Sequence, residues 1–198
     1  MLDRARKAPG PKGARLKGAG LYEEGIRIPL WVKDPTGQFV SQPEVTRKQV
    51  SSNVDIAPML LTMASGNAWR DDPNLAYLSQ RFDLTSVLQD PDAPGRPYAL
   101  HATDEDGFEF GPRLFPFLQD APWHVMGLIT EDSKLGVYTH WEDGSTEIVT
   151  QGQDTEYYDY STEDGRLELT NSAGPGNTRY NEEYQLLMSE AVPNELRA

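Results

Sequence analysis

Residues 17–30, KGAGLYEEGIRIPL, and residues 50–61, VSSNVDIAPMLL, carry the strongest fold signal in the chain. The first stretch runs into a nearly continuous apolar segment, residues 26–32, which is typical of a strand buried on both faces. Pro29 cannot donate to a strand ladder, so it belongs at the strand entrance or at a sheet edge. The second stretch favours a helix over residues 55–64, with Asp55 at the N-cap and Pro58 in the first turn, where its missing N–H costs nothing. These patterns predict a strand at residues 28–32 and a helix at 55–64.

The pattern changes after residues 90–97, DPDAPGRP, which form the clearest linker signal in the chain. Asp143-Gly144 is a two-residue hairpin signal, and a terminal helix over residues 181–191 would place Tyr180, Tyr184, Leu187 and Ala191 on one face. An α/β fold is therefore predicted, whose second half is a small antiparallel sheet with a C-terminal helix. The strands expected in that half cover residues 98–103, 125–130, 134–141, 146–149 and 156–160.

Weaker local signals lie between these elements. Residues 33–37 and the pair Asp164-Gly165 are typical of turns. A short helix is expected over residues 82–88, capped near Asp83, and residues 71–80 are expected to be irregular.

Composition and charge exclude several classes of protein. The chain has 198 residues, 37% of them hydrophobic, and no apolar run reaches the length of a membrane-spanning helix, so we expect a soluble protein. The first seventeen residues hold six Lys and Arg against one acid, which leaves 12 basic and 30 acidic residues in the remainder. Such an acidic body repels nucleic acid and anionic lipid, so neither is an expected partner. The absence of cysteine excludes disulfides and thiolate metal sites.

The two quoted stretches, in this order, resemble the second half of a formylglycine-dependent (type I) sulfatase of the alkaline-phosphatase superfamily. In that family a lysine precedes a YEEGIRVP-like strand, and a VDIAPTL-like helix follows. SKLGVY at residues 133–138 and EYYD at 156–159 are similar to segments near the family's C-terminus. The resemblance implies the C-terminal portion of an alkaline-phosphatase-like α/β sandwich plus a small antiparallel sheet, with the N-terminal catalytic half absent. The implied organisation is a flexible basic segment at 1–16, the end of the sulfatase α/β domain at 17–90 and a C-terminal subdomain at 98–198.

The resemblance assigns one catalytic position, Lys17, to contact with the substrate sulfate. The family's metal ligands lie N-terminal to this lysine, so Ca²⁺ or Mg²⁺ is expected in the complete parent enzyme and no cofactor in this chain alone. The family's nucleophile arises from Cys or Ser in a Cys/Ser-x-Pro-x-Arg motif, whereas the nearest spacing here, residues 92–96, begins with Asp92. The resemblance therefore implies a sulfuric ester hydrolase whose partners are a small sulfate ester and the missing N-terminal half, and a chain that is inactive alone.

Other interpretations remain open at this stage. Lys17 also fits a solvated lysine in a basic tail, and the chain also fits a non-catalytic binding or structural remnant, or a related phosphonate- or phosphate-ester hydrolase. His101, His124 and His140 are too dispersed to indicate a catalytic triad, and the tryptophans are expected in the core or at an interface. No secretory signal is visible in residues 1–16, and the parent fits either a cytoplasmic or a periplasmic or secreted enzyme.

Overall fold

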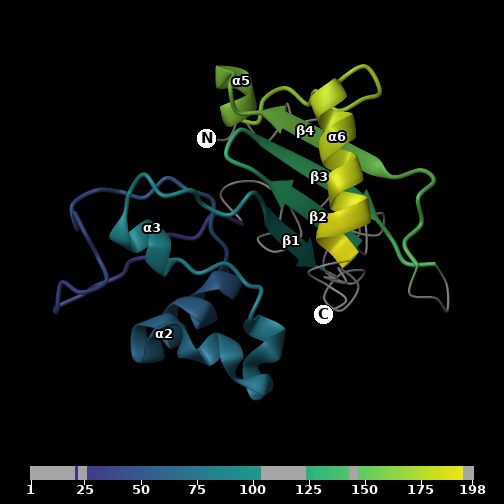
Figure 1. The fold of residues 1–198 in the computed structure, drawn as a ribbon. Helices are drawn as coiled ribbons and strands as arrows, with labels where there is room; N and C mark the ends of the chain where they lie inside the picture. The colour runs from purple at the N-terminus through teal and green to yellow at the C-terminus, as the bar shows by residue number, and fades with distance from the viewer. Residues whose placement is uncertain (1–20, 22–25, 104–123, 143–146, 194–198) are drawn as a thin grey trace, which may run out of the picture. The chain divides into compact units, whose positions relative to one another are not determined.

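The computed structural model describes residue 21 and residues 26–103, 124–142 and 147–193 (Figure 1). The chain divides into two compact units, one within residues 29–99 and the other formed by residues up to 28 together with those from 100 onward. The predicted flexible segment 1–16, Lys17 and the Asp143-Gly144 turn lie outside the described residues.

The second unit is built on a four-stranded sheet in the order β1-β2-β3-β4, and β3 pairs antiparallel with both β2 and β4. The predicted strands at 98–103, 125–130, 134–141 and 156–160 are thereby confirmed. The strand predicted at 146–149 is reduced to one antiparallel bridge between Trp141 and Ile148. The strands are β1 (Ala99–Thr103), β2 (His124–Ile129), β3 (Ser133–Thr139) and β4 (Asp154–Asp159).

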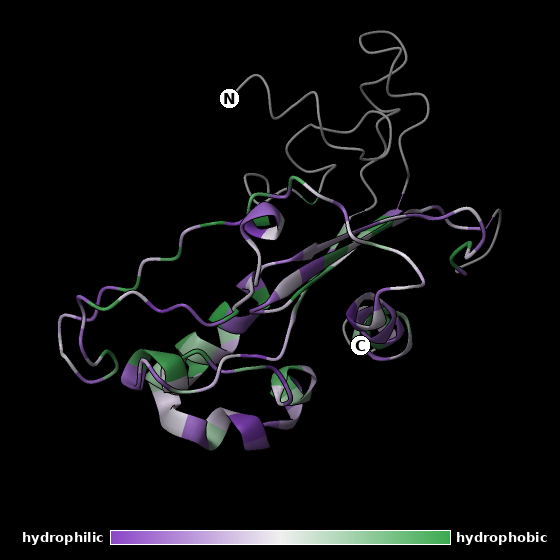
Figure 2. Ribbon diagram, turned by 90° about the horizontal axis from the view of Figure 1, so that it is seen from above, coloured by the Kyte–Doolittle hydropathy of each residue, from purple (hydrophilic) through white to green (hydrophobic). Residues whose placement is uncertain are grey.

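A helix packs on one face of this sheet, as Figures 1 and 2 show from two directions. It comprises α6 (Thr178–Leu186), capped by the Asn177 side chain, which accepts from the Tyr180 N–H at 3.2 Å, and the π-helical continuation η6 (Leu187–Ala191). Leu187 and Ala191 are fully buried, so the terminal helix and its predicted inward face are confirmed. Among the described residues, no helix combines the length and apolar character needed to cross a bilayer.

Strand alternation gives the sheet two different faces. The face under α6 is mainly apolar and includes Met126, Leu128, Leu135 and Val137, all of them buried. The opposite face carries polar groups and glycines among its apolar residues; it holds Val125, Gly127, Lys134, Gly136, Tyr138, Glu156 and Tyr158. After β4, a short helix α5 (Glu163–Arg166) replaces the turn predicted at Asp164-Gly165, because the Thr162 hydroxyl caps it by accepting from the Gly165 N–H at 2.9 Å.

Residues 29–99 contain helices but no strand before Ala99. The predicted helix at 55–64 is confirmed by η2 (Asn53–Asp55) and α2 (Ile56–Ser65), and the one at 82–88 by α3 (Thr85–Gln89), with Asp83 accepting from the Thr85 N–H at 2.9 Å. Two 3-10 helices lie between them, η3 (Gly66–Asp71) and η4 (Pro73–Leu78). The expectation of irregular structure at 71–80 is therefore wrong, because Asp72 caps η4 by accepting from the Asn74 N–H at 2.8 Å.

The strand predicted at residues 28–32 is not formed. This segment has no regular secondary structure, and Ile28, Leu30 and Trp31 are 64%, 50% and 90% exposed. A strand needs a neighbour to satisfy its backbone groups, and no neighbouring strand lies beside it among the described residues. Of the two places expected for Trp31, a core or an interface, its exposure excludes the core.

Two polar side chains organise the irregular parts of residues 29–99. Asp34 accepts from four backbone N–H groups between residues 36 and 40, at 2.7–3.1 Å, which confirms the predicted turn at 33–37. Hydrogen bonds to the Asp34 carboxylate hold its pKa well below the usual range. The bond from the Thr36 hydroxyl has the largest effect, and the bond from the Phe39 N–H adds to it. Arg47 donates to the carbonyls of Ser41, Val87 and Leu88 and so joins segments about forty residues apart.

Candidate functional site

The predicted site residue Lys17 lies outside the described residues, but Leu21, four positions later, is described and fully buried. Leu21 packs against the sheet face opposite α6, in a cluster with Val125 and Tyr138. Its backbone carbonyl accepts a hydrogen bond from the Lys134 Nζ of β3. Leu21 belongs to the segment 17–90 of the predicted organisation. In the structure it is held by the sheet that follows residue 98.

The Leu21 side chain occupies a space left by two glycines that face each other across β2 and β3, Gly127 and Gly136. A Cβ atom at Gly127 would lie 2.6 Å from Leu21 Cδ2, and one at Gly136 would lie 2.8 Å from Leu21 Cδ1. Neither distance is compatible with normal packing, so a larger residue at Gly127 requires Leu21 to move, and one at Gly136 requires both Leu21 and Glu156 to move, since Glu156 Cγ would also lie 2.8 Å away. We call this pair the glycine slot.

A buried charged network surrounds the slot. The Lys134 Nζ forms an ion pair with Glu168 and lies 5.4 Å from the centre of the Tyr158 ring. Glu156 accepts hydrogen bonds from the hydroxyls of Tyr138 at 2.5 Å and Tyr158 at 3.0 Å. Burying a charge is unfavourable unless it is paired and hydrogen-bonded, and here Lys134 and both carboxylates have such partners.

This network is closed to substrate, because its charged groups are almost completely buried. Its carboxylates are engaged by a lysine or by tyrosine hydroxyls, so neither is available as a general base. The arrangement instead fixes the position of the backbone at Leu21.

A second polar cluster lies between the sheet and α6. The Ser133 hydroxyl donates to Glu183 of α6 at 2.7 Å, and the Tyr157 hydroxyl donates to the same carboxylate at 3.1 Å. Burial, followed by the charge of Glu183, raises the pKa of Tyr157 to about 12. Tyr157 therefore remains a hydrogen-bond donor at neutral pH and is not an activated nucleophile.

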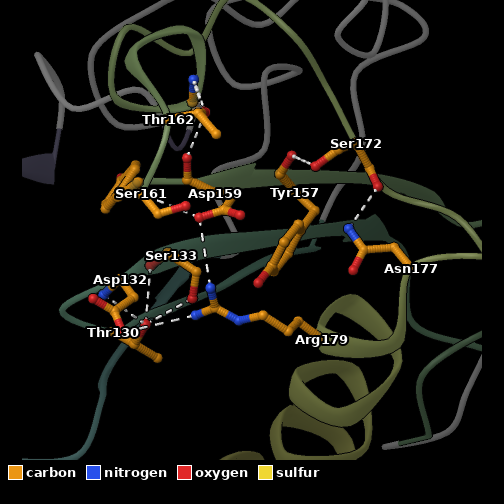
Figure 3. Close-up of polar contacts among 12 residues, drawn as sticks. Thr130, Asp132, Ser133, Tyr157, Asp159, Ser161, Thr162, Ser172, Asn177 and Arg179 are labelled. Atoms are coloured by element: carbon orange, nitrogen blue, oxygen red, sulfur yellow. Dashed lines mark hydrogen bonds and ion pairs between the residues drawn. The ribbon is translucent and has the colours of Figure 1, made fainter.

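Arg179 connects α6 to the ends of the strands. Figure 3 shows its side chain extending toward Asp132 and Asp159, at 3.9 and 3.5 Å. Hydrogen bonds from the Ser161 side chain and N–H, the leading causes, lower the pKa of Asp159, and Arg179 adds to this effect. Because Arg179 is 44% exposed, this ion pair contributes little to stability, and its role is to orient the helix end.

Within residues 29–99, the charged residues that resemble a motif are also structural. Arg96, the arginine of the Asp92–Arg96 spacing, forms a buried ion pair with Asp55 at 3.0 Å. A groove of about 620 Å³ lies beside α2 and α3. In this groove the Thr62 hydroxyl donates a hydrogen bond to the Asp83 carboxylate at 2.5 Å, and the Arg70 guanidinium lies 3.7 Å from the same carboxylate. These polar side chains therefore interact with one another.

The three histidines lie in or beside the strands of the sheet. His101 is in β1, His140 follows β3, and His124 of β2 lies against the Trp141 ring with 4.4 Å between ring centres. Within the described residues, no group of three His, Cys, Asp or Glu side chains is arranged to hold a metal ion.

No protein-family model and no curated protein matches the chain. A solved structure described as BT4656 in complex with its substrate D-glucosamine-2-N,6-O-disulfate is similar to it, with a TM-score of 0.52 at 22% sequence identity. The similarity covers 78% of this chain but only 26% of that chain, so the chain spans about a quarter of its length. The chain thus shares its α/β fold with part of that structure.

The sequence analysis did not identify Lys134, Glu156 and Glu168 as partners in one buried network. A local signal was present, since a lysine and two small residues interrupt the otherwise apolar segment SKLGVYT. The contact with Leu21 joins residues 113 positions apart, and no local pattern encodes such a pairing.

Proposed function

We propose that this chain is the C-terminal part of a sulfatase-like hydrolase that cleaves sulfate esters, and that Lys17 contacts the sulfate. The observation that carries the proposal is the fold shared with BT4656, whose substrate is a sulfated sugar, over 78% of the chain. The order of the Lys17, YEEGIRIP and VDIAPML segments supports the same family. A small molecule bearing a sulfate ester is the proposed substrate class.

The proposed role of Lys17 is electrostatic. Negative charge grows on the sulfuryl and leaving-group oxygens as a sulfate ester breaks, and a fixed ammonium group offsets that charge. The interaction accelerates the reaction because it is stronger in the transition state than in the ground state. The nucleophile and a Ca²⁺ or Mg²⁺ ion are proposed to belong to other parts of the complete enzyme, so this chain alone is expected to be inactive.

The exposed apolar side chains of Ile28, Leu30 and Trp31 support a missing partner. Consecutive exposed apolar residues of this size mark surfaces that are covered in the working protein. We propose that residues 28–32 pair with the N-terminal half of the sulfatase α/β domain. In that setting the segment would become the strand that its sequence pattern predicts.

The test is Lys17→Ala in the complete enzyme, with Lys12→Ala as the control from the same basic segment. Removing one such contact commonly lowers kcat by about 10²–10³. We expect that loss with an aryl sulfate for Lys17→Ala, and less than a twofold change for Lys12→Ala. A loss under tenfold for Lys17→Ala would remove the assignment. Faster turnover of an aryl phosphate or phosphonate than of the sulfate would favour the related ester hydrolases, and no turnover of any ester would favour a non-catalytic remnant.

A further inference from the structure

We propose that the groove beside α2 and α3 binds a saccharide that carries an anionic group, namely a carboxylate, a sulfate or a phosphate. All the residues that line the groove come from positions 62–89, so it lies within one compact unit. Its volume of about 620 Å³ falls within the range of roughly 300–1,000 Å³ that is common for small-molecule sites. No residue outside 62–89 is needed for this binding, so the proposal stands independently of the proposed function.

The lining of the groove is almost entirely polar. It consists of amide, guanidinium, hydroxyl and carboxylate groups, and Phe82 is the one apolar side chain among the described residues that line it. Sites for small ligands are more often mainly apolar with a few polar groups. A polar lining favours a ligand that is itself rich in hydroxyl groups, because hydrogen bonds to water must be replaced when the ligand binds. The Phe82 ring adds an apolar surface on which the C–H side of a sugar ring can pack.

Three side-chain amides in the lining make no hydrogen bond to another described residue. They belong to Asn67, Gln80 and Gln89, which are all exposed. An amide has both donors and an acceptor, and this matches a sugar hydroxyl, which also donates and accepts. These amides can therefore bind a ligand without the loss of a contact inside the protein.

Arg70 presents a guanidinium group that is held in place before any ligand binds. It lies over the Trp69 ring at 4.4 Å from the ring centre, donates to the Ser79 carbonyl at 2.5 Å and lies 3.7 Å from Asp83. Its side chain is 31% exposed, so other N–H groups of the guanidinium can reach a ligand. A side chain fixed in this way loses less conformational freedom on binding than a mobile one.

The charges of the lining favour an anionic ligand. Two guanidinium groups, those of Arg70 and Arg81, line the groove together with the carboxylate of Asp83. That carboxylate already accepts hydrogen bonds from the hydroxyls of Thr62 and Thr85, at 2.5 and 2.7 Å. In a chain with a formal net charge of -13, this local excess of cationic groups makes the groove a favourable place for an anion. Guanidinium groups also match the planar, bidentate geometry of such anions.

An NMR titration of this chain tests the proposal, with the side-chain amide signals of Asn67, Gln80 and Gln89 as the readout. The probes are glucose 6-sulfate, glucose 6-phosphate, glucuronate, glucose and inorganic sulfate. The anionic sugars should shift these signals and bind about tenfold more tightly than glucose or inorganic sulfate, because they alone use the amides and the guanidinium groups together. The anionic sugar that binds most tightly identifies the anionic group. Added salt should weaken its binding and leave that of glucose unchanged.

Substitutions in the groove provide the second arm of the test. Arg81→Gln should weaken binding of the tightest anionic sugar about tenfold, and Gln80→Ala about threefold. Lys48→Gln is the matched control, since it removes the same charge from an exposed residue of the same unit outside the groove, and it should change binding by less than about twofold. Backbone amide spectra establish that each variant is folded, and Gln80→Ala, at an exposed residue, carries the test if Arg81→Gln is not.

Several outcomes would overturn the proposal. Amide signals that stay unchanged at millimolar concentrations of every probe would do so, as would equal losses of binding in Arg81→Gln and Lys48→Gln. Inorganic sulfate binding as tightly as the anionic sugars would overturn the saccharide assignment. Glucose binding as tightly as they do would overturn the requirement for an anionic group.

Discussion

The sheet unit and the 29–99 unit bury their side chains in different ways. In the sheet unit, Met126, Leu128, Leu135 and Leu187 are completely buried between the strands and the terminal helix. In residues 29–99, Trp31, Leu60 and Tyr77 are mostly exposed, and irregular segments are joined by polar groups such as Asp34 and Arg47. The sheet unit closes on its own apolar core, whereas residues 29–99 leave several large apolar side chains exposed.

Under the proposed function, residues 29–99 are the unit whose stability depends more on the rest of the enzyme. Apolar burial provides most of the free energy of folding, and it is roughly proportional to the area removed from water. A unit that leaves large apolar side chains in water forgoes that contribution and relies more on its buried polar contacts. The following predictions test this contrast, beginning with the largest effect.

Arg96→Met should destabilise residues 29–99 by about 3–5 kcal/mol, because it removes a guanidinium group that lies 3.0 Å from the buried Asp55 carboxylate. If the two units unfold separately, the sheet unit keeps its transition. Urea unfolding followed by hydrogen exchange for each unit measures this. The double variant Arg96→Met/Asp55→Asn should recover part of the loss, and equal destabilisation of both units would contradict the separation.

Leu128→Ala should lower the free energy of unfolding of the sheet unit by about 2–5 kcal/mol, because the truncation opens a cavity in a closed core. Its matched variant in the other unit is Leu60→Ala, which removes a 56% exposed side chain and should change stability by no more than about 0.5 kcal/mol. Urea unfolding of both variants provides the comparison. Similar losses would show that residues 29–99 also fold around a closed core.

Tyr157 should make the sheet unit sensitive to alkali. Its pKa is raised from 10.0 to about 12, so the folded state favours the protonated phenol. The resulting stabilisation is complete below pH 10 and is lost as the pH rises from about 10 to 12. Unfolding measured across that interval should show a smaller decline in Tyr157→Phe than in the wild type. Tyr77→Phe, at a residue 68% exposed, is the control that should retain the wild-type decline.

Trp31→Ala should have the smallest effect on this chain, within about 0.5 kcal/mol, because the side chain is 90% exposed. The variant should lose the component of tryptophan fluorescence that iodide quenches most readily. In the complete enzyme, the same substitution should weaken association with the proposed N-terminal half. Strong protection of Trp31 from iodide in the isolated chain would contradict the exposed surface.

Local patterns in the sequence were sufficient to predict most helices and strands of the sheet unit. The largely apolar segments HVMGLI and SKLGVYT, and the turn residues between them, predict paired strands whose partners are nearby in the chain. The helix at α2 was also predictable from its apolar spacing, but the predicted cap was wrong, because Asp55 does not cap α2 and its carboxylate instead accepts from the Ser52 N–H at 2.7 Å. These elements depend on contacts between residues close in sequence.

The errors have two physical origins, contacts between residues distant in sequence and local capping that competes with a turn. The apolar run at residues 28–32 correctly predicts a preference for the strand conformation, but pairing requires a neighbour. The short helix α5 depends on the capping geometry of Thr162, which competes closely with a turn at Asp164-Gly165. The buried partners of Lys134 are distant in sequence, so the network around Leu21 became visible only in three dimensions.

The hydrogen bond between Lys134 and Leu21 also imposes an order on biosynthesis. Leu21 leaves the ribosome before β3 has been synthesised, and 113 residues separate the two partners. At about 5–20 residues per second, the Leu21 segment waits roughly 6–23 s before its binding surface exists. During that interval its apolar side chain is available to chaperones or to incorrect partners. Codon changes that slow translation between residues 21 and 134 should therefore increase misfolding of the nascent chain.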